Sequence, residues 1–217
     1  MTRRWLWPVL ILALVAALLL GVGVGSASIP PARAWAALIG HGDPVERAIL
    51  VELRLPRAIL GLGVGAMLGL AGAALQGYLR NPLAEPSVLG ASNGAALGAV
   101  VALYFGLAAQ YPAALPLVAI AGALAALALL FVLTGRSESA LTLILAGIAV
   151  ATLAGAGISL ALNLSPNPFA AIEIMTWLLG SLEDRSFRHV LLALPCIALG
   201  MVLLAGQGRA LDALTLG

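Results

Sequence analysis

The sequence predicts an all-α fold, a polytopic bundle of membrane-spanning helices, and three observations lead to this prediction. Of the 217 residues, 62% are hydrophobic and only 9% are charged, with a mean hydropathy of +1.10. Soluble domains contain about 45–50% apolar and about 25% charged residues, so a soluble core cannot hide this much apolar surface. Long uncharged stretches separate the charged residues, and glycines recur at every fourth position within several of them. These patterns predict helices that cross a bilayer and pack closely together.

The uncharged stretches set the expected number of crossings, because a helix needs about 20 residues to cross a hydrocarbon core. The longest stretch, residues 86–135, has 50 residues and as one helix would be about 75 Å long, so it must fold back. We place that turn near Gln110, Tyr111 and Pro112, where a polar residue, an interfacial aromatic and a helix breaker coincide. The six expected spans are approximately residues 5–27, 58–79, 88–108, 114–134, 141–162 and 190–208.

The segment between the last two spans is expected to lie at the membrane surface. Residues 163–168 have the composition of a turn that ends the fifth span. Residues 174–182 are nine uncharged residues, which are too few to cross. Trp177 within them suits the level of the lipid headgroups.

The first stretch is interpreted as a span rather than as a cleaved signal peptide. Its apolar run exceeds the roughly 7–15 residues of a signal-peptide core, although residues 26–28 offer a cleavage site. The arginines divide almost evenly between the two sides of the membrane. Because Arg3 and Arg4 adjoin the first helix, which often sets the orientation, we favour a cytoplasmic N-terminus.

Several functions are disfavoured by what the sequence lacks. All eleven basic residues are scattered arginines, which gives no nucleic-acid footprint. Without lysine there is no phosphate-binding G-x-x-x-x-G-K-[ST] loop, so any ATP must bind another chain. The six spans contain no charged residue or histidine, which disfavours ion coupling. No metal site is expected. The G-x-S-x-G match at residues 90–94 lacks the strand that a nucleophile elbow needs. The lone Cys196 is expected to be buried among apolar groups.

Small residues at intervals of four mark the expected helix contacts, because they let helix backbones approach each other in lipid. Those singled out for packing are Gly61, Gly65 and Gly69 in the second span, Gly98 in the third, and Gly147 and Gly155 in the fifth. Thr152 and Ser159 lie seven residues apart on one face of the fifth span. They are candidates to line a polar pathway, although such hydroxyls also bond to their own helix.

A continuous set of motifs surrounds the second and third spans. It runs Arg54-Leu55-Pro56-Arg57, Leu75-Gln76-Gly77, Arg80-Asn81-Pro82-Leu83-Ala84-Glu85-Pro86 and Val88-Leu89-Gly90-Ala91-Ser92-Asn93-Gly94-Ala95. Shorter motifs follow at residues 145–147, 177–181 and 209–217. Together they resemble the FecCD family of ABC importer permeases, whose members carry ferric siderophores, haem or cobalamin.

The resemblance implies roles for particular residues. Arg54 and Arg57, at the outer mouth of the second span, would receive acidic residues of a substrate-binding protein, a task that suits the planar donor fork of arginine. The alternative is that they only anchor the helix end at the membrane surface. Ser137, Glu138 and Ser139 would form an inner gate. The signature loop of the family supplies a larger set, namely Asn81, Pro82, Leu83, Ala84, Pro86, Gly90, Ser92, Asn93 and Gly94.

The resemblance also implies partners. The chain would sit in the bacterial cytoplasmic (inner) membrane as a homodimer of permease subunits. Cytoplasmic ATPase subunits would bind ATP and Mg²⁺, and a periplasmic or lipid-anchored binding protein would deliver the chelate. On this interpretation the chain is not an enzyme and needs no cofactor of its own.

The family fold implied by the resemblance has about ten spans, and since each takes about 20 residues, this chain would hold the first six. We therefore expect residues 1–217 to be a single permease domain that is incomplete at its C-terminus. One alternative is a metal-ion ABC permease or another polytopic carrier. A second is an intramembrane enzyme, which would need a polar catalytic cluster that the six spans do not contain. The identity of the chelate stays open.

Overall fold

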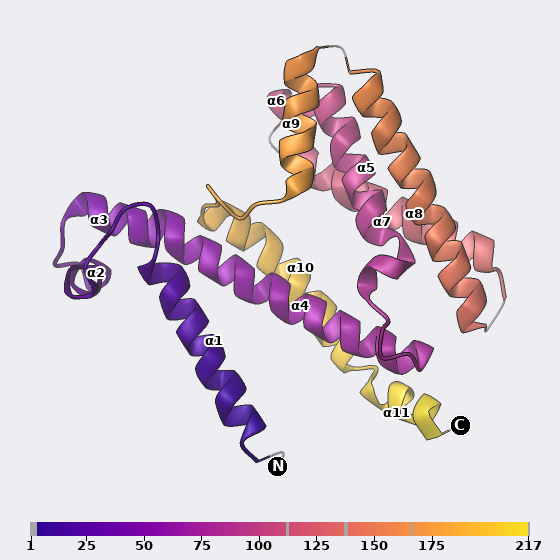
Figure 1. Cartoon of the computed structure of the whole chain (residues 1–217), viewed down its shortest axis with the longest axis horizontal. Helices are drawn as coiled ribbons and strands as arrows, with labels where there is room; N and C mark the ends of the chain where they lie inside the picture. The colour runs from indigo at the N-terminus through magenta and orange to yellow at the C-terminus, as the bar shows by residue number, and fades with distance from the viewer. Residues whose placement is uncertain (1–3, 112, 137–138, 166, 217) are drawn as a thin grey trace. The chain divides into compact units, whose positions relative to one another are not determined.

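The computed structural model describes residues 4–111, 113–136, 139–165 and 167–216, and the regular structure in these ranges is helical throughout (Figure 1). This confirms the all-α prediction. In chain order the helices are α1 (Leu6–Gly23), α2 (Pro31–Leu38), α3 (Pro44–Ala48), η1 (Ile49–Arg54), α4 (Leu55–Leu79), η2 (Pro86–Leu89), α5 (Ala91–Tyr104), α6 (Leu107–Gln110), α7 (Ala114–Thr134), α8 (Ala140–Asn163), α9 (Pro168–Leu179), α10 (Phe187–Ala205) and α11 (Gly208–Leu216). The chain divides into a first unit, Met1–Leu70 with Leu182–Gln207, and a second unit, Ala71–Ser181 with Gly208–Gly217.

Five helical stretches among the described residues are long and apolar enough to cross a bilayer, namely Leu6–Gly23, Pro44–Leu79, Ala114–Thr134, Ala140–Asn163 and Phe187–Ala213. The third expected span, residues 88–108, is instead centred on α5, a helix of 14 residues. At about 1.5 Å per residue α5 is about 21 Å long, which is shorter than a hydrocarbon core of about 30 Å. Gly90 (φ 74°) and Gly106 (φ 64°) flank α5 in the left-handed conformation, which an α-helix does not continue. Among the described residues, five helices are thus long enough to cross and α5 is shorter, and a crossing at residues 88–108 stays a prediction.

The second membrane helix begins earlier than the sequence predicts. Pro44–Leu79 is one continuous helical stretch, whereas the span was expected to start at residue 58. Charged residues marked the expected boundary, yet Glu46, Glu52 and Arg57 all lie within the stretch. The π-helical segment η1 connects α3 to α4 without a break. Charged residues mark where a helix leaves the lipid, but the helix can continue beyond them.

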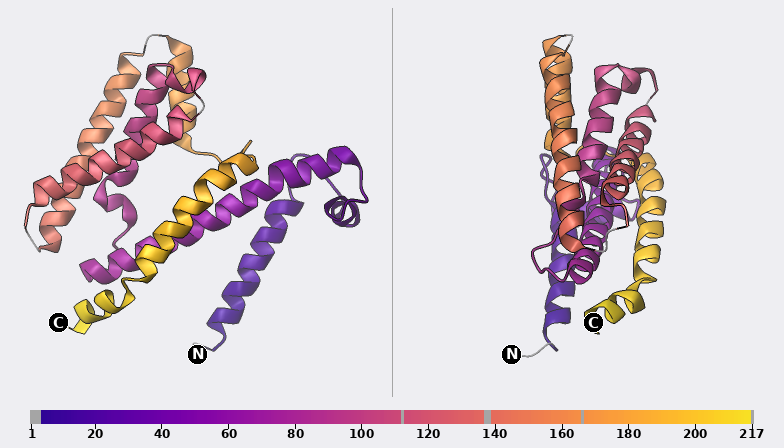
Figure 2. Two further views of the ribbon diagram at one scale, coloured as in Figure 1. Left: turned by 180° about the vertical axis from the view of Figure 1, so that it is seen from behind. Right: turned by 90° about the vertical axis from the view of Figure 1, so that its right-hand side faces the viewer.

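The first unit is built on α4 and α10, which lie along each other (Figure 2). Two glycines allow the close approach. A Cβ on Gly63 would lie 2.9 Å from Cδ2 of Leu194, and one on Gly200 would lie 3.0 Å from Cε of Met67. A larger residue at either position would push the two helices apart.

A small apolar core lies beyond the end of α1 in the same unit. Ile29, Ala37 and Leu50 form this cluster, which joins the segment after α1 to α2 and η1. By contrast, α1 itself contains no buried residue. Its position therefore depends on contacts near its C-terminal end.

Helix α5 is the centre of the second unit, where α7, α8 and α9 contact it. A Cβ on Gly94 would lie 2.6 Å from the backbone oxygen of Gly122 in α7, and one on Gly98 would collide with the backbone oxygen of Val118. On α8, a Cβ on Gly147 would collide with the backbone of the segment before α5. Backbone contacts at glycine thus hold this unit together, as the small-residue spacing predicts for helices in lipid.

Other glycines of the expected packing set make no such contact. No atom lies within 4 Å of a Cβ built on Gly65, Gly69 or Gly155, and one built on Gly61 meets only a leucine side chain at 3.7 Å. Among the described residues, the expected packing glycines of the second span, Gly61, Gly65 and Gly69, therefore make no close helix contact. The contact is made by Gly63, which lies between two of these glycines.

Helix α9 is packed against α5. Ile174 is fully buried against Val100 and Leu103 of α5, and Trp177 packs on the same cluster. A helix of 12 residues is too short to cross a bilayer but long enough to cover the face of another helix. Trp177 contacts this core, and its position at the level of the lipid headgroups stays a prediction.

Cys196 does not occupy the buried position that its apolar surroundings predict. It is exposed on α10. The residues of α10 that approach α4 are Leu194 and Ile197, whose side chains lie near Gly63. Because successive residues of a helix point about 100° apart, Cys196 lies on a different face.

Candidate functional site

Arg54, the first arginine of the pair Arg54 and Arg57, lies just before α4 and points at the end of α1. It is buried, with 6% of its surface exposed. Its Nη1 donates to the backbone oxygens of Val22 at 3.1 Å and Gly23 at 2.9 Å, and its Nη2 donates to the backbone oxygen of Ala27. The guanidinium is therefore occupied by backbone groups of the same chain.

Arg57, the second arginine of the pair, is less engaged. It is half-buried, and its Nη2 lies 3.5 Å from the backbone oxygen of Gly21. The family resemblance implies the same task for both arginines, which is to receive acidic residues of a binding protein. In the structure, Arg54 would have to give up its backbone bonds to do so, whereas Arg57 has, among the described residues, this one long bond to lose. Docking stays a prediction for both residues.

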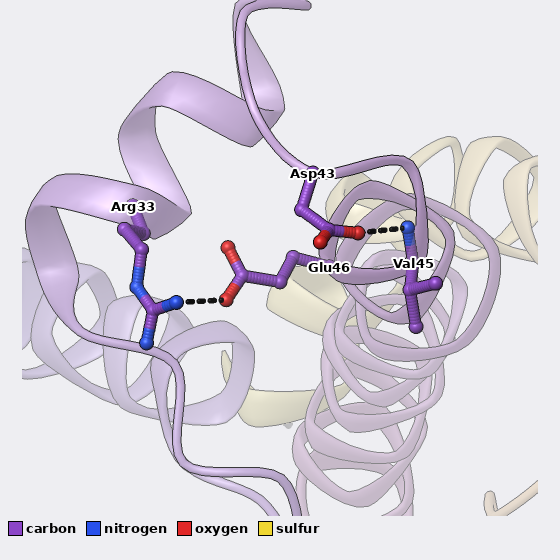
Figure 3. Close-up of polar contacts among 4 residues, drawn as sticks. All are labelled: Arg33, Asp43, Val45 and Glu46. Atoms are coloured by element: carbon purple, nitrogen blue, oxygen red, sulfur yellow. Dashed lines mark hydrogen bonds and ion pairs between the residues drawn. The ribbon is translucent and has the colours of Figure 1, made fainter.

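An ion pair joins α2 to α3 in the same unit, and a local hydrogen bond caps α3. Nη1 of Arg33 lies 3.1 Å from Oε1 of Glu46, and the carboxylate of Asp43 accepts a hydrogen bond from the N–H of Val45 at 2.7 Å (Figure 3). The Arg33 side chain is 64% exposed, and such exposed ion pairs contribute about 0–1 kcal/mol. The N-cap at Asp43 fixes where α3 begins. A hollow of about 400 Å³ lies beside them, lined by Gly40, Gly42, Pro44, Arg47, Ala48, Val51 and Glu52.

The signature loop starts at the C-terminal end of α4 and is folded by its own polar groups. Arg80 adopts the left-handed conformation (φ 50°), and the N–H of Asn81 donates to the oxygen of Gln76 at 3.2 Å, as in a Schellman ending. The Asn81 side chain accepts from the N–H of Leu83 at 2.9 Å. Nε2 of Gln76 donates to the oxygen of Ala84 at 3.3 Å. These bonds give the loop a defined shape.

The tip of this loop presents apolar side chains outward. Leu83 is 86% exposed, and Pro82 beside it is also exposed, whereas Ala84 is buried. Pro86 opens the short helix η2, and Ser92 in the first turn of α5 is exposed. The loop residues predicted from the motif therefore divide into outward-facing ones and ones that fold the loop.

The second half of the signature loop is held against α8. Gly90 lies so close to α8 that a Cβ would be 3.1 Å from the oxygen of Gly147. One turn further along α8, Nδ2 of Asn93 donates to the backbone oxygen of Ala151 at 3.2 Å. A glycine contact and a side-chain hydrogen bond thus fix the position of α5 along α8.

The candidate pathway residues lie on an open face of α8. Thr152 and Ser159 are both exposed. The Thr152 hydroxyl donates to the oxygen of Ile148 in its own helix at 2.8 Å, and the backbone oxygen of Ser159 accepts from Nδ2 of Asn163 at 2.8 Å. These two hydroxyl-bearing residues lie in an otherwise apolar helix, and the pathway role stays a prediction.

Only part of the candidate inner gate can be placed. Ser137 and Glu138 lie outside the described residues. Ser139 is the N-cap of α8, and its Oγ accepts from the N–H of Thr142 at 3.4 Å. This contact starts a helix, and a gate at Ser139 stays a prediction.

Some contacts that hold the helices have no local signal in the sequence. The Tyr104 hydroxyl donates to the backbone oxygen of Leu164, 60 residues away, at 2.9 Å, and so joins the end of α5 to the end of α8. The bonds of Arg54 to the end of α1 are of the same kind. The only available signal is that a polar side chain beside an apolar stretch must find a partner.

Long apolar helices, backbone contacts at glycine and polar side chains bonded to helix carbonyls define a multi-pass helical membrane protein. Residues 12–217 match the FecCD transport family. The chain belongs to this family, as the motifs around the second and third spans predict.

Similar proteins are ABC transporter permeases. The chain is 42% identical over 219 residues to the ABC transporter permease protein YvrB of Bacillus subtilis, a match that covers 94% of this chain and 61% of that protein. It is 38% identical over 188 residues to the cobalamin import system permease protein BtuC of Halobacterium salinarum, covering 85% of this chain and 50% of the relative. A solved inward-facing conformation of a metal-chelate type ABC transporter matches with a TM-score of 0.83 and 31% identity, over 100% of this chain and 66% of that one. The chain thus spans about half to two thirds of the length of these proteins.

Proposed function

We propose that this chain is a membrane-spanning part of the permease of an ABC importer, which carries a metal chelate across the bacterial cytoplasmic membrane. The observation that carries the proposal is the match of residues 12–217 to the FecCD transport family. The similarity to a cobalamin import permease and to a metal-chelate type transporter supports the substrate class, which comprises iron siderophores, haem and cobalamin.

On this proposal the chain forms part of the path for the chelate, and a partner supplies the energy for transport. Cytoplasmic ATPase subunits bind ATP with Mg²⁺, and binding and hydrolysis rock two permease copies so that a path between them opens first outward and then inward. The sequence supports a separate ATPase because it contains no lysine for a phosphate-binding loop.

The exposed face of α8 is the proposed wall of that path. Thr152 and Ser159 place hydroxyl groups there, and no charged residue lies between them. A pathway must bind its cargo strongly enough to admit it but weakly enough to release it. Weak polar contacts without a fixed charge meet that requirement for a large chelate.

Purification of the tagged protein from the membrane of its own host tests the proposal. We expect an ATPase and a chelate-binding protein to co-purify in mild detergent, and the rate of ATP hydrolysis to rise when the loaded binding protein is added. The matched control carries an ATPase whose phosphate-binding lysine is replaced. A protein that purifies without an ATPase contradicts the proposal, and a partner that binds bare metal ions favours a metal-ion permease instead.

A further inference from the structure

Helix α2 presents large apolar side chains on an exposed face. Trp35 is 67% exposed, Leu38 is 40% exposed, and Ile39, which ends the helix, is 53% exposed. Residues three and four positions apart lie on the same face of a helix, so the three side chains form one patch. We call Trp35, Leu38 and Ile39 the α2 patch. Apolar side chains gathered in this way, rather than scattered singly, indicate a surface that contacts a protein or a membrane.

The other sides of α2 are used within the chain. Ala37 is fully buried in the small apolar core beyond the end of α1. Arg33 lies about 200° around the helix from Trp35, which is close to the opposite side. It is the one charged residue of α2, and it pairs with Glu46 (Figure 3). Helix α2 is therefore amphipathic, as are helices that lie on the surface of a bilayer.

The core that holds α2 lies at the end of an apolar helix that is long enough to cross a membrane. Val22, in the last turn of α1, packs against the buried cluster that contains Ala37. Helix α1 has 18 residues and is thus about 27 Å long, close to the roughly 30 Å of a hydrocarbon core. A helix of this length that crosses a bilayer ends near the lipid boundary. Its neighbour α2 would then lie at the level of the headgroups, where tryptophan is enriched.

The direction of α2 fits this level. Figure 1 shows α2 almost end-on while α1 runs across the view, so α2 crosses the direction of α1 rather than continuing it. A short helix that crosses a membrane-spanning helix in this way runs along the bilayer surface, as interfacial helices do. The exposed apolar surface of α1 also continues to its end, since Leu20 is 62% exposed and Val24 is 64% exposed. Lipid that covers the end of α1 is therefore close to α2.

We propose that α2 is an interfacial helix, and that the α2 patch inserts into the headgroup region of the leaflet in which α1 ends. A lipid surface is favoured over a soluble partner because the patch carries no charged group and adjoins the end of a membrane helix. Held there, α2 fixes the level of the segment between α1 and α4 relative to the bilayer. The inference is independent of the transport function, since it requires only that α1 crosses the membrane.

Spin-label accessibility in lipid nanodiscs tests the position of the patch in the assembled transporter. In a Cys196→Ser background, Leu38→Cys and Ile39→Cys place the label on the patch. The matched control is Arg33→Cys, on the opposite side of α2, where the loss of an exposed ion pair costs little stability. We expect the patch labels to collide several times more often with oxygen, which concentrates in lipid, than with a water-soluble nickel chelate. The control label should show the reverse.

Three other outcomes would each overturn the proposal. Patch labels that collide mainly with the nickel chelate would show that the patch faces water. Patch labels that neither reagent reaches would show that another part of the transporter covers the patch. Patch labels that become immobile only when the binding protein is added would show that this protein is the partner.

Trp35 provides a second test that introduces no cysteine. The protein and its Trp35→Phe variant are compared in nanodiscs whose lipids carry bromine in the upper part of the acyl chains, because bromine quenches the fluorescence of nearby tryptophans. The difference between the two emission spectra reports Trp35 alone. We expect this difference to lose most of its intensity in brominated lipid relative to unbrominated lipid. A difference spectrum of equal intensity in the two lipids would contradict the insertion of α2.

Discussion

Polar side chains in the second unit are used to bond the backbone of neighbouring helices. Asn93 bonds to the oxygen of Ala151, and Tyr104 bonds to the oxygen of Leu164. In a bilayer core no water replaces a lost partner, so these bonds favour one alignment of α5 along α8 over others. Their value lies in fixing that alignment, because hydrogen bonds between membrane helices average about 0.6 kcal/mol.

Replacing Asn93 tests this use of a polar group. Asn93→Leu should lower the free energy of unfolding by about 0.6–1.7 kcal/mol, because the bond to Ala151 is lost while the apolar volume is kept. Denaturant-induced unfolding in detergent micelles measures the change. The neighbouring Ser92→Ala is the control, since Ser92 is exposed, and an equal loss in both variants would show that the bond contributes nothing.

The sequence predicts a set of packing glycines but not what each of them touches. Gly98 and Gly65 have the same small-residue spacing, yet only Gly98 lies against another backbone. The spacing specifies one face of a helix, and the neighbour of that face is set by how the other helices fold. The bonds of Arg54 to the end of α1 could not be predicted for the same reason, because they depend on where α1 ends relative to Arg54.

At the scale of elements, α5 and α7 of the second unit touch backbone to backbone. Gly98→Ala should destabilise the protein by about 1–3 kcal/mol, because its methyl has no room beside Val118 and an overpacked contact must open. Gly65→Ala, in the same kind of pattern but with no atom within 4 Å, should be neutral or slightly stabilising. Thermal midpoints of the two variants in one detergent give the comparison. Similar midpoints would contradict the role of the α5–α7 contact.

The ends of helices are predicted correctly where turn residues mark them. They are predicted wrongly where charge was the only mark. Helix α7 spans Ala114–Thr134, which coincides with the expected residues 114–134, and α8 spans Ala140–Asn163 against the expected 141–162. The helix expected from residue 58 begins at Pro44, because charged side chains can extend from a helix into water. The short α5 was unpredictable because η2 and α6, which flank it, have equally apolar sequences.

At the scale of the whole molecule, the orientation in the membrane is the first property to test. In a Cys196→Ser background, Tyr111→Cys should react with a membrane-impermeant maleimide in intact cells, whereas Leu83→Cys should react only after permeabilisation. Both positions are exposed, and they lie on either side of α5 in sequence. The reverse pattern would contradict a cytoplasmic N-terminus, and equal labelling would contradict a crossing by α5.

Uptake of a radiolabelled chelate into proteoliposomes tests the central claim most directly. The vesicles contain the purified protein with its ATPase partner, and the binding protein is added outside. We predict accumulation of a ferric siderophore, haem or cobalamin that requires both ATP hydrolysis and the binding protein, and that stops with a non-hydrolysable ATP analogue. A complex that hydrolyses ATP but accumulates none of these chelates would contradict the proposed function.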